Sequence, residues 1–279
     1  MALVPTLELP SHALAYEIRG EGPAVLLLGG SGEPMLAWEL CGLVDALVAT
    51  GRTVVWYAAR GVLPSGCPPL PWSVTSMAED ASALMEHLGI DAYTGIGYSL
   101  GGFTLEELAH REPHRLTRAV LVASAGVAGA GTVREAWNAA DATFARSHGE
   151  IPAQFSRLMT LMTSLGGPEL TDPVLVAQWW ELLADQQDQW APPYGEVGQA
   201  QVATSWTEAG STTGRPWPGV PAALAYFEHD VLFPPSEAAA VAAHLGGAAV
   251  EIVPGTGHAG LFSQPAATTA ALVRLLDAV

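Results

Sequence analysis

The sequence contains no lysine, and its 11 basic residues, all arginine, are outnumbered by 28 acidic residues. A chain without lysine cannot form a lysine Schiff base or build a phosphate-binding loop that depends on lysine. The formal net charge of −17 argues against nucleic acids and anionic membranes as partners, because both need a basic protein face. We therefore predict a small-molecule substrate, and neither a nucleic-acid nor a membrane partner.

Sulfur and metal-binding patterns are equally scarce. The two cysteines, Cys41 and Cys67, form no C-x-x-C, and the eight histidines form no H-E-x-x-H and no cluster with cysteine. We predict no disulfide framework, no metal and no cofactor.

Long apolar runs are also missing. No run approaches the ~18 residues that a membrane helix needs. The stretch from Met1 to Pro10 has neither the basic residue nor the apolar core of a secretory signal. Hydrophobic residues nevertheless make up 49% of the chain, which favours a folded protein. We expect a soluble, cytoplasmic protein, either a monomer or a homodimer.

Predicted strands and helices alternate along most of the chain. Strands are predicted at residues 13–19, 23–28, 53–57, 92–96, 119–123, 222–227 and 249–253, and helices at 38–49, 74–88, 103–109, 236–245 and 264–279. Several strands are apolar throughout, as strands buried on both faces are. This alternation predicts an α/β fold whose mostly parallel sheet carries helices on both faces.

The alternation stops at residues 126–216, where no strand pattern occurs. This segment is helical in pattern and rich in tryptophan: Trp137, Trp179, Trp180, Trp190 and Trp206. We predict that residues 126–216 form a helical cap inserted into a core of residues 1–125 and 217–279.

Residues 95–102 read Gly-Ile-Gly-Tyr-Ser-Leu-Gly-Gly and contain G-x-S-x-G with Ser99 at its centre. A strand pattern precedes this motif and a helix pattern follows it. This order indicates a sharp turn that exposes the serine, with glycines where a side chain would collide with neighbouring backbone. A plain turn serine is the alternative interpretation.

Two further polar residues follow predicted strands. Asp230 comes after strand 222–227, and His258 comes after strand 249–253. Parallel strands place their carboxyl ends at one edge of a sheet, so Ser99, Asp230 and His258 can meet there. The alternatives are that Asp230 caps the next helix, near Pro234 and Pro235, and that His258 is an ordinary loop residue.

Taken in order, these motifs resemble the α/β-hydrolase family over nearly the whole chain. The matching pieces are residues 26–30, the turn at Ser99, residues 111–113, residues 228–230 and residues 257–258. Bacterial esterases, cofactor-free haloperoxidase-like proteins and methylesterases of aromatic polyketide pathways are the most similar members. The resemblance implies a mostly parallel sheet of mainly eight strands, and a role in bacterial secondary metabolism.

The resemblance also implies roles for single residues. Ser99 would be the nucleophile, His258 the base that takes its proton, and Asp230 the acid that orients His258. The backbone N–H groups of Ser31 and Leu100 would form the oxyanion hole. Gly30, Met159, Met162 and Trp179 are the predicted lining of the substrate pocket.

The chain departs from the family pattern in two places. Residues 58–65 lack the acidic residue and one glycine that many members carry in this loop. Gly29 stands where many members have a histidine that braces the oxyanion loop, which predicts a looser loop or extra space for substrate.

These residues lead to three hypotheses for function. The first is hydrolysis of a carboxylic ester or thioester of a medium-to-large apolar substrate, through an acyl-enzyme on Ser99. The second is lyase or cyclase chemistry with the same three residues. The third is ligand binding without catalysis.

Overall fold

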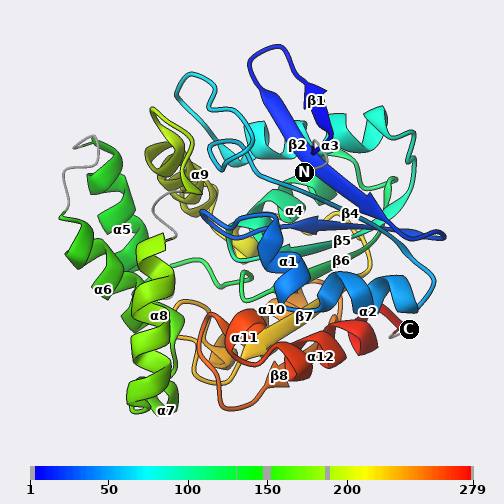
Figure 1. The fold of residues 1–279 in the computed structure, drawn as a ribbon. Coiled ribbons are helices and arrows are strands. Elements are labelled where there is room, and N and C mark those ends of the chain that lie inside the picture. The colour runs from blue at the N-terminus through cyan, green and yellow to red at the C-terminus, as the bar shows by residue number, and fades with distance from the viewer. Residues whose placement is uncertain (1–3, 130, 147–151, 186–188, 278–279) are drawn as a thin grey trace.

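The computed structural model describes residues 4–129, 131–146, 152–185 and 189–277. Its centre is one sheet of eight strands in the order β1-β2-β4-β3-β5-β6-β7-β8 (Figure 1). The strands are β1 (Thr6–Glu8), β2 (Ala13–Arg19), β3 (Ala24–Leu28), β4 (Thr53–Tyr57), β5 (Tyr93–Tyr98), β6 (Leu116–Val122), β7 (Ala222–Phe227) and β8 (Ala249–Val253). The predicted eight-stranded sheet is confirmed.

Most of the sheet is parallel. β2 pairs antiparallel with β1 and β4, and every neighbouring pair from β4 to β8 is parallel. The inner strands are apolar on both faces because helices cover both, and β7 is buried along its whole length. The carboxyl ends of β3, β5, β7 and β8 therefore lie at one edge of the sheet.

Helices form a layer on each face of the sheet (Figure 1). One apolar core lies under α1 (Leu36–Leu40), α2 (Leu43–Ala49), α11 (Gly260–Ser263) and α12 (Pro265–Asp277). The core on the other face lies under α3 (Val74–His87), α4 (Leu100–Arg111) and α10 (Ala238–His244). The predicted helices on both faces are confirmed.

The structure differs from the predicted elements in two places. The helix predicted at residues 38–49 is two helices, α1 and α2, because Gly42 between them has a φ of 77° that an α-helix cannot contain. β1 was not predicted at all. It has three residues, too few for an alternating pattern to be recognised.

A helical insertion, defined here as helices α5 to α9, lies between β6 and β7. Its helices are α5 (Val133–Arg146), α6 (Ala153–Ser164), α7 (Gly167–Leu170), α8 (Pro173–Asp185) and α9 (Gly195–Glu208). Helices α5 to α8 project to one side of the sheet, and α9 packs beside α3 and α4 (Figure 1). In the described part of the chain, none of the helices is long and apolar enough to span a bilayer. The predicted domain division at residues 126 and 216 stays a prediction.

Candidate active site

Ser99 lies in a strained turn at the carboxyl end of β5. β5 ends at Tyr98 and α4 begins at Leu100, and Ser99 between them has φ 49° and ψ −121°. A residue with a Cβ rarely adopts such a conformation, so the surrounding contacts must hold it there. One of these contacts is a 3.0 Å hydrogen bond from the N–H of Ser99 to the carbonyl of Val122, at the end of β6.

Two glycines allow the backbone to close around this turn. A Cβ at Gly101 would lie 2.0 Å from the carbonyl oxygen of Leu28, and a Cβ at Gly97 would lie 2.6 Å from the carbonyl oxygen of Gly101. Both distances are far below van der Waals contact. The start of α4 can therefore approach β3 only because no side chain is present at these positions.

The structure brings Ser99, His258 and Asp230 together. The hydroxyl oxygen of Ser99 lies 3.0 Å from Nε2 of His258, and Nδ1 of the same ring lies 2.8 Å from Oδ2 of Asp230. With its proton on Nδ1, the imidazole donates to Asp230 and accepts from the Ser99 hydroxyl. These residues are 28 to 159 positions apart in the chain, so their meeting depends on the fold.

Asp230 is held by two sets of contacts. Its Oδ1 accepts backbone hydrogen bonds from Leu232 at 2.8 Å and Phe233 at 3.0 Å, which leaves Oδ2 for His258. Only 3% of the Asp230 surface is exposed. The carboxylate thus holds the turn that follows β7 and contacts the imidazole. It does not cap the next helix as the alternative interpretation expected, because the N-cap residue of α10 is Glu237.

Aromatic rings fix the imidazole from its faces. Tyr98 stacks on His258 with ring centres 5.5 Å apart, and Phe233 stacks on it at 5.8 Å. The Tyr98 hydroxyl also donates to the carbonyl oxygen of His258 at 3.2 Å. The motifs did not identify Tyr98 or Phe233 as site residues, although Tyr98 directly precedes Ser99 and Phe233 follows Asp230 by three positions.

The loop after β3 is braced by two buried side chains. The backbone N–H of Gly30 donates to Oε2 of Glu33 at 2.7 Å, and that of Gly32 donates to Oε1 of Gln199 on α9 at 2.9 Å. Gln199 is fully buried, and its amide nitrogen donates to the carbonyl of Arg60. Glu33 and Gln199 thus anchor the loop where the histidine of other members is missing, and the looser loop or extra space expected from Gly29 stays a prediction.

The two N–H groups predicted for the oxyanion hole lie beside this braced region. Ser31 is exposed within the loop, and Leu100 is buried at the first position of α4. Among the described residues, neither backbone N–H has a hydrogen-bond partner. Both groups therefore remain available to a ligand, and their function as an oxyanion hole stays a prediction.

The atypical loop at residues 58–65 is also well anchored. Arg60 forms two hydrogen bonds of 2.7 Å with the carboxylate of Asp80 on α3, and both side chains are buried. Ser65 donates to the carbonyl of Ala58 at 2.7 Å. Asp80 thus provides the acidic partner that the loop itself lacks.

The predicted pocket residues have different environments. Gly30 is buried, and a Cβ there would lie 3.0 Å from the Tyr98 ring. Met159 and Met162 on α6 are about half exposed, at 48% and 52%. Trp179 is buried in a small core with Leu161, Leu165, Leu183 and Ala259, next to His258. A pocket formed by these residues stays a prediction.

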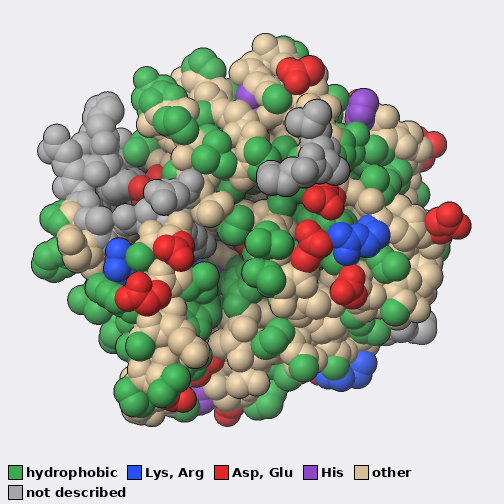
Figure 2. All heavy atoms as spheres, viewed as in Figure 1, with side chains coloured by type: hydrophobic (Ala, Val, Ile, Leu, Met, Phe, Trp, Pro, Cys, Tyr) green, Lys and Arg blue, Asp and Glu red, His purple; other side chains and the backbone are tan. Residues whose placement is uncertain are grey.

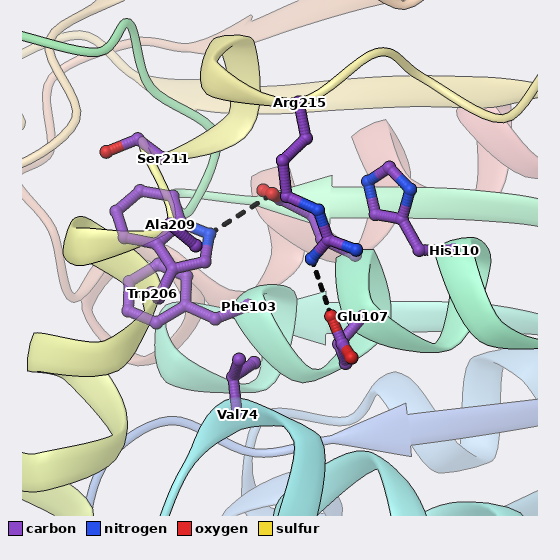
Figure 3. A pocket seen from close by; sticks show the side chains of 9 residues that line it. Val74, Phe103, Glu107, His110, Trp206, Ala209, Ser211 and Arg215 are labelled. Carbon is purple, nitrogen blue, oxygen red and sulfur yellow. Dashed lines mark hydrogen bonds and ion pairs between the residues drawn. The ribbon is translucent and has the colours of Figure 1, made fainter.

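Figure 3 shows a small cavity between α4 and the end of α9, lined by Phe103, Trp206, Arg215 and their neighbours. Its volume is about 10 Å³, room for about one water molecule. Glu106 at its wall accepts hydrogen bonds from the Trp206 indole at 3.1 Å and the Thr212 hydroxyl at 2.7 Å. The cavity is too small for a substrate.

Across the described residues, His, Cys, Asp and Glu side chains form no group of three that could hold a metal ion.

The comparison with known families agrees with this geometry. A sequence profile of the alpha/beta hydrolase fold matches residues 23–265. The chain belongs to the alpha/beta hydrolase fold family. The resemblance predicted from its motifs is thus confirmed.

Several members of the alpha/beta hydrolase fold family are similar to this chain. A Mycobacterium tuberculosis protein provisionally named non-heme bromoperoxidase BpoC is 26% identical over 266 residues, 95% of this chain and 98% of BpoC. 3-Oxoadipate enol-lactonase 2 of Acinetobacter baylyi is 29% identical over 136 residues, 48% of this chain and 49% of the relative. The solved structure of Rv0554 from Mycobacterium tuberculosis superposes with a TM-score of 0.82 at 26% identity, covering 96% and 94% of the two chains.

The close contact at Gly101 predicts a specific loss of stability. Gly101→Ala places a methyl group against the Leu28 carbonyl, and we expect the free energy of unfolding in urea to fall by about 1–3 kcal/mol or more. Gly167→Ala is the control, since its Cβ would meet nothing within 4 Å. Equal stabilities of the two variants would contradict the steric explanation.

Two buried carboxyl groups predict the pH dependence of stability. Burial raises the pKa of Glu33 to about 8 and that of Glu106 to about 7. An unfolded glutamate titrates near about 4.3. The folded state therefore keeps protons that the unfolded state has released, and the free energy of unfolding falls as pH rises through this interval.

Glutamine variants isolate the contribution of each glutamate to the pH dependence of the free energy of unfolding. For Glu33→Gln, we expect the free energy of unfolding relative to the wild type to rise from pH 5 and level off near the folded pKa of about 8. For Glu106→Gln, the rise should level off about one pH unit earlier, near the folded pKa of about 7. Urea unfolding at several pH values measures both curves, and a difference independent of pH would contradict the prediction.

Proposed function

We propose that the protein is a serine hydrolase that cleaves a carboxylic ester through an acyl-enzyme on Ser99. The observation that carries this proposal is the unbroken series of hydrogen bonds from Ser99 through His258 to Asp230. This arrangement lets a neutral imidazole take a proton from the serine while a buried carboxylate stabilises the resulting imidazolium.

In the first half-reaction, the oxygen of Ser99 attacks the ester carbonyl carbon and Nε2 of His258 takes the hydroxyl proton. Negative charge develops on the former carbonyl oxygen, where the N–H groups of Ser31 and Leu100 would donate to it. The intermediate then collapses, and the bond to the alcohol oxygen breaks. His258 returns its proton to that oxygen, and the alcohol leaves.

In the second half-reaction, a water molecule replaces the alcohol. His258 takes a proton from the water as the water oxygen attacks the acyl carbon. Collapse of the second intermediate breaks the bond to Ser99, and the proton passes from His258 back to the serine oxygen. The products are a carboxylic acid, the alcohol and the unchanged enzyme.

Several observations support an uncharged, largely apolar substrate. Figure 2 shows a hollow between the helical insertion and α1, with hydrophobic side chains around it. Both elements carry exposed apolar residues, among them Leu36 and Leu40 on α1 and Met159 and Met162 on α6 of the insertion. The net charge of −17 disfavours anionic substrates such as acyl-CoA. The enol-lactonase among the relatives indicates that cyclic esters belong in a substrate screen.

The lyase or cyclase hypothesis has less support than hydrolysis. It was based on the atypical loop at residues 58–65 and on Gly29. Arg60 is anchored by Asp80, and the loop after β3 is braced by Glu33 and Gln199, so other contacts replace those that the two departures remove. Turnover in water labelled with oxygen-18 separates the two reactions, since only hydrolysis incorporates the label into the acid product.

Covalent labelling tests the proposed nucleophile. Intact mass after incubation with a fluorophosphonate should show one adduct on the wild type and none on Ser99→Ala, with kcat for ester cleavage lowered about 10⁶-fold in the variant. Asp230→Asn should lower kcat about 10⁴-fold, because the imidazole then loses the partner that fixes its tautomer.

Ser124→Ala is a matched control. Ser124 is buried near Gly102, and its hydroxyl has no hydrogen-bond partner among the described residues. This variant should be labelled like the wild type. A folded wild type that forms no adduct, or an adduct that survives in Ser99→Ala, would contradict the proposal.

A further inference from the structure

The loop that carries His258 is held from outside by the helical insertion. The N–H of Gly257 donates to Oε2 of Glu169 at 2.8 Å, and the N–H of Ala259 donates to the carbonyl of Ser164 at 2.8 Å. Both acceptors lie in or next to helices α6 and α7 of the insertion. The backbone is thus fixed immediately before and immediately after the imidazole that contacts Ser99.

Glu169 is the centre of this contact. Its side chain is buried, and its Oε2 also accepts from the N–H of Gly166 at 2.7 Å. Its Oε1 accepts from the Thr256 hydroxyl at 3.1 Å. A buried carboxylate needs hydrogen-bond donors to offset its loss of hydration, and here the backbone and side chain of residues 256 and 257 supply two of them.

Residues 164–169 of the insertion and the loop that carries His258 also pack too closely to move independently. A Cβ at Gly257 would lie 2.3 Å from the backbone nitrogen of Gly166, so the chains touch backbone to backbone. Below this contact, Ala259 packs with Leu161, Leu165, Trp179 and Leu183 of the insertion. Residues 164–169 therefore cannot lift away from the His258 loop without exposing apolar surface and breaking buried hydrogen bonds.

We propose that Glu169 is a positioning residue for His258, through which the helical insertion sets the distance between the imidazole and Ser99. This inference rests on the proposed hydrolase function. It adds that the insertion is part of the catalytic geometry and not only a cover over it. Its physical basis is that proton transfer depends steeply on the placement of the base, and a displacement of about 1 Å can lower the rate about 10²-fold.

Two substitutions at Glu169 distinguish positioning from general stability. Glu169→Ala removes the acceptor, and we expect kcat to fall about 10- to 100-fold with KM within about twofold. The rate constant for fluorophosphonate labelling should fall in parallel. Glu169→Gln should restore both values to near wild type, because its amide oxygen can accept from Gly257 and its amide nitrogen can donate to the Thr256 hydroxyl.

Hydrogen exchange provides a readout that does not depend on activity. The amides of Gly257 and Ala259 should exchange faster in Glu169→Ala than in the wild type, and Glu169→Gln should return them to wild-type protection. Glu107→Ala is the control. It also removes a buried carboxylate, one that is bound to Thr75 and Arg215, and among the described residues no hydrogen bond or ion pair joins Glu107 to the His258 loop, so this variant should lower the Tm without the fall in kcat.

The outcomes separate this inference from the proposed function. A wild type that is not labelled would contradict the hydrolase proposal itself. A labelled wild type together with a folded Glu169→Ala that keeps the wild-type labelling rate and kcat would overturn the positioning role alone. Should Glu169→Ala not fold, Glu169→Asp decides the question, because the shorter carboxylate cannot keep its hydrogen bond to Gly257 unless the loop shifts. Wild-type rates in Glu169→Asp would likewise overturn the proposal.

Discussion

The turn at Ser99 depends on one steric condition: the backbone at the start of α4 must lie against the end of β3. The carbonyl of Leu28 occupies the space that a side chain at Gly101 would need. Because β3 and β5 are neighbours in the sheet, this contact places the Ser99 hydroxyl beside the loop that follows β3. The strained φ of Ser99 and the position of the predicted oxyanion N–H groups both follow from this single approach of two backbones.

The helical insertion supplies buried polar contacts to the core at several separate points. Gln199 reaches the loop after β3, Trp206 reaches Glu106 on α4, and Arg134 pairs with Glu237 beyond β7. Glu169 reaches the loop after β8. A buried donor or acceptor that loses its partner costs about 1–3 kcal/mol. Detaching the insertion would break all of these contacts, so we expect the insertion and the sheet to unfold together.

The sequence predicted what local patterns encode and missed what depends on distant contacts. Apolar runs located the inner strands, the G-x-S-x-G motif located Ser99, and the loops after two of the strands located Asp230 and His258. The pattern did not predict β1 because that strand is short. It did not predict the break at Gly42 because the apolar spacing continues across it. The contacts of Gln199 and Glu169 were not predicted for a different reason. Their partners lie 167 and 88 residues away, and a buried glutamine or glutamate has no local signal that separates it from an exposed one.

The bracing of the loop after β3 explains how the site tolerates Gly29. An oxyanion hole needs a fixed backbone N–H, and any buried acceptor on the neighbouring peptide groups can fix it. Glu33 does this within the loop, and its Oε2 can accept from Gly30 whether or not the carboxyl is protonated. A change of pH therefore alters the stability of the fold, through the raised pKa of Glu33, more than it alters the brace. Gln199 adds an acceptor that cannot ionise, so the geometry of the loop does not rest on a titrating group alone.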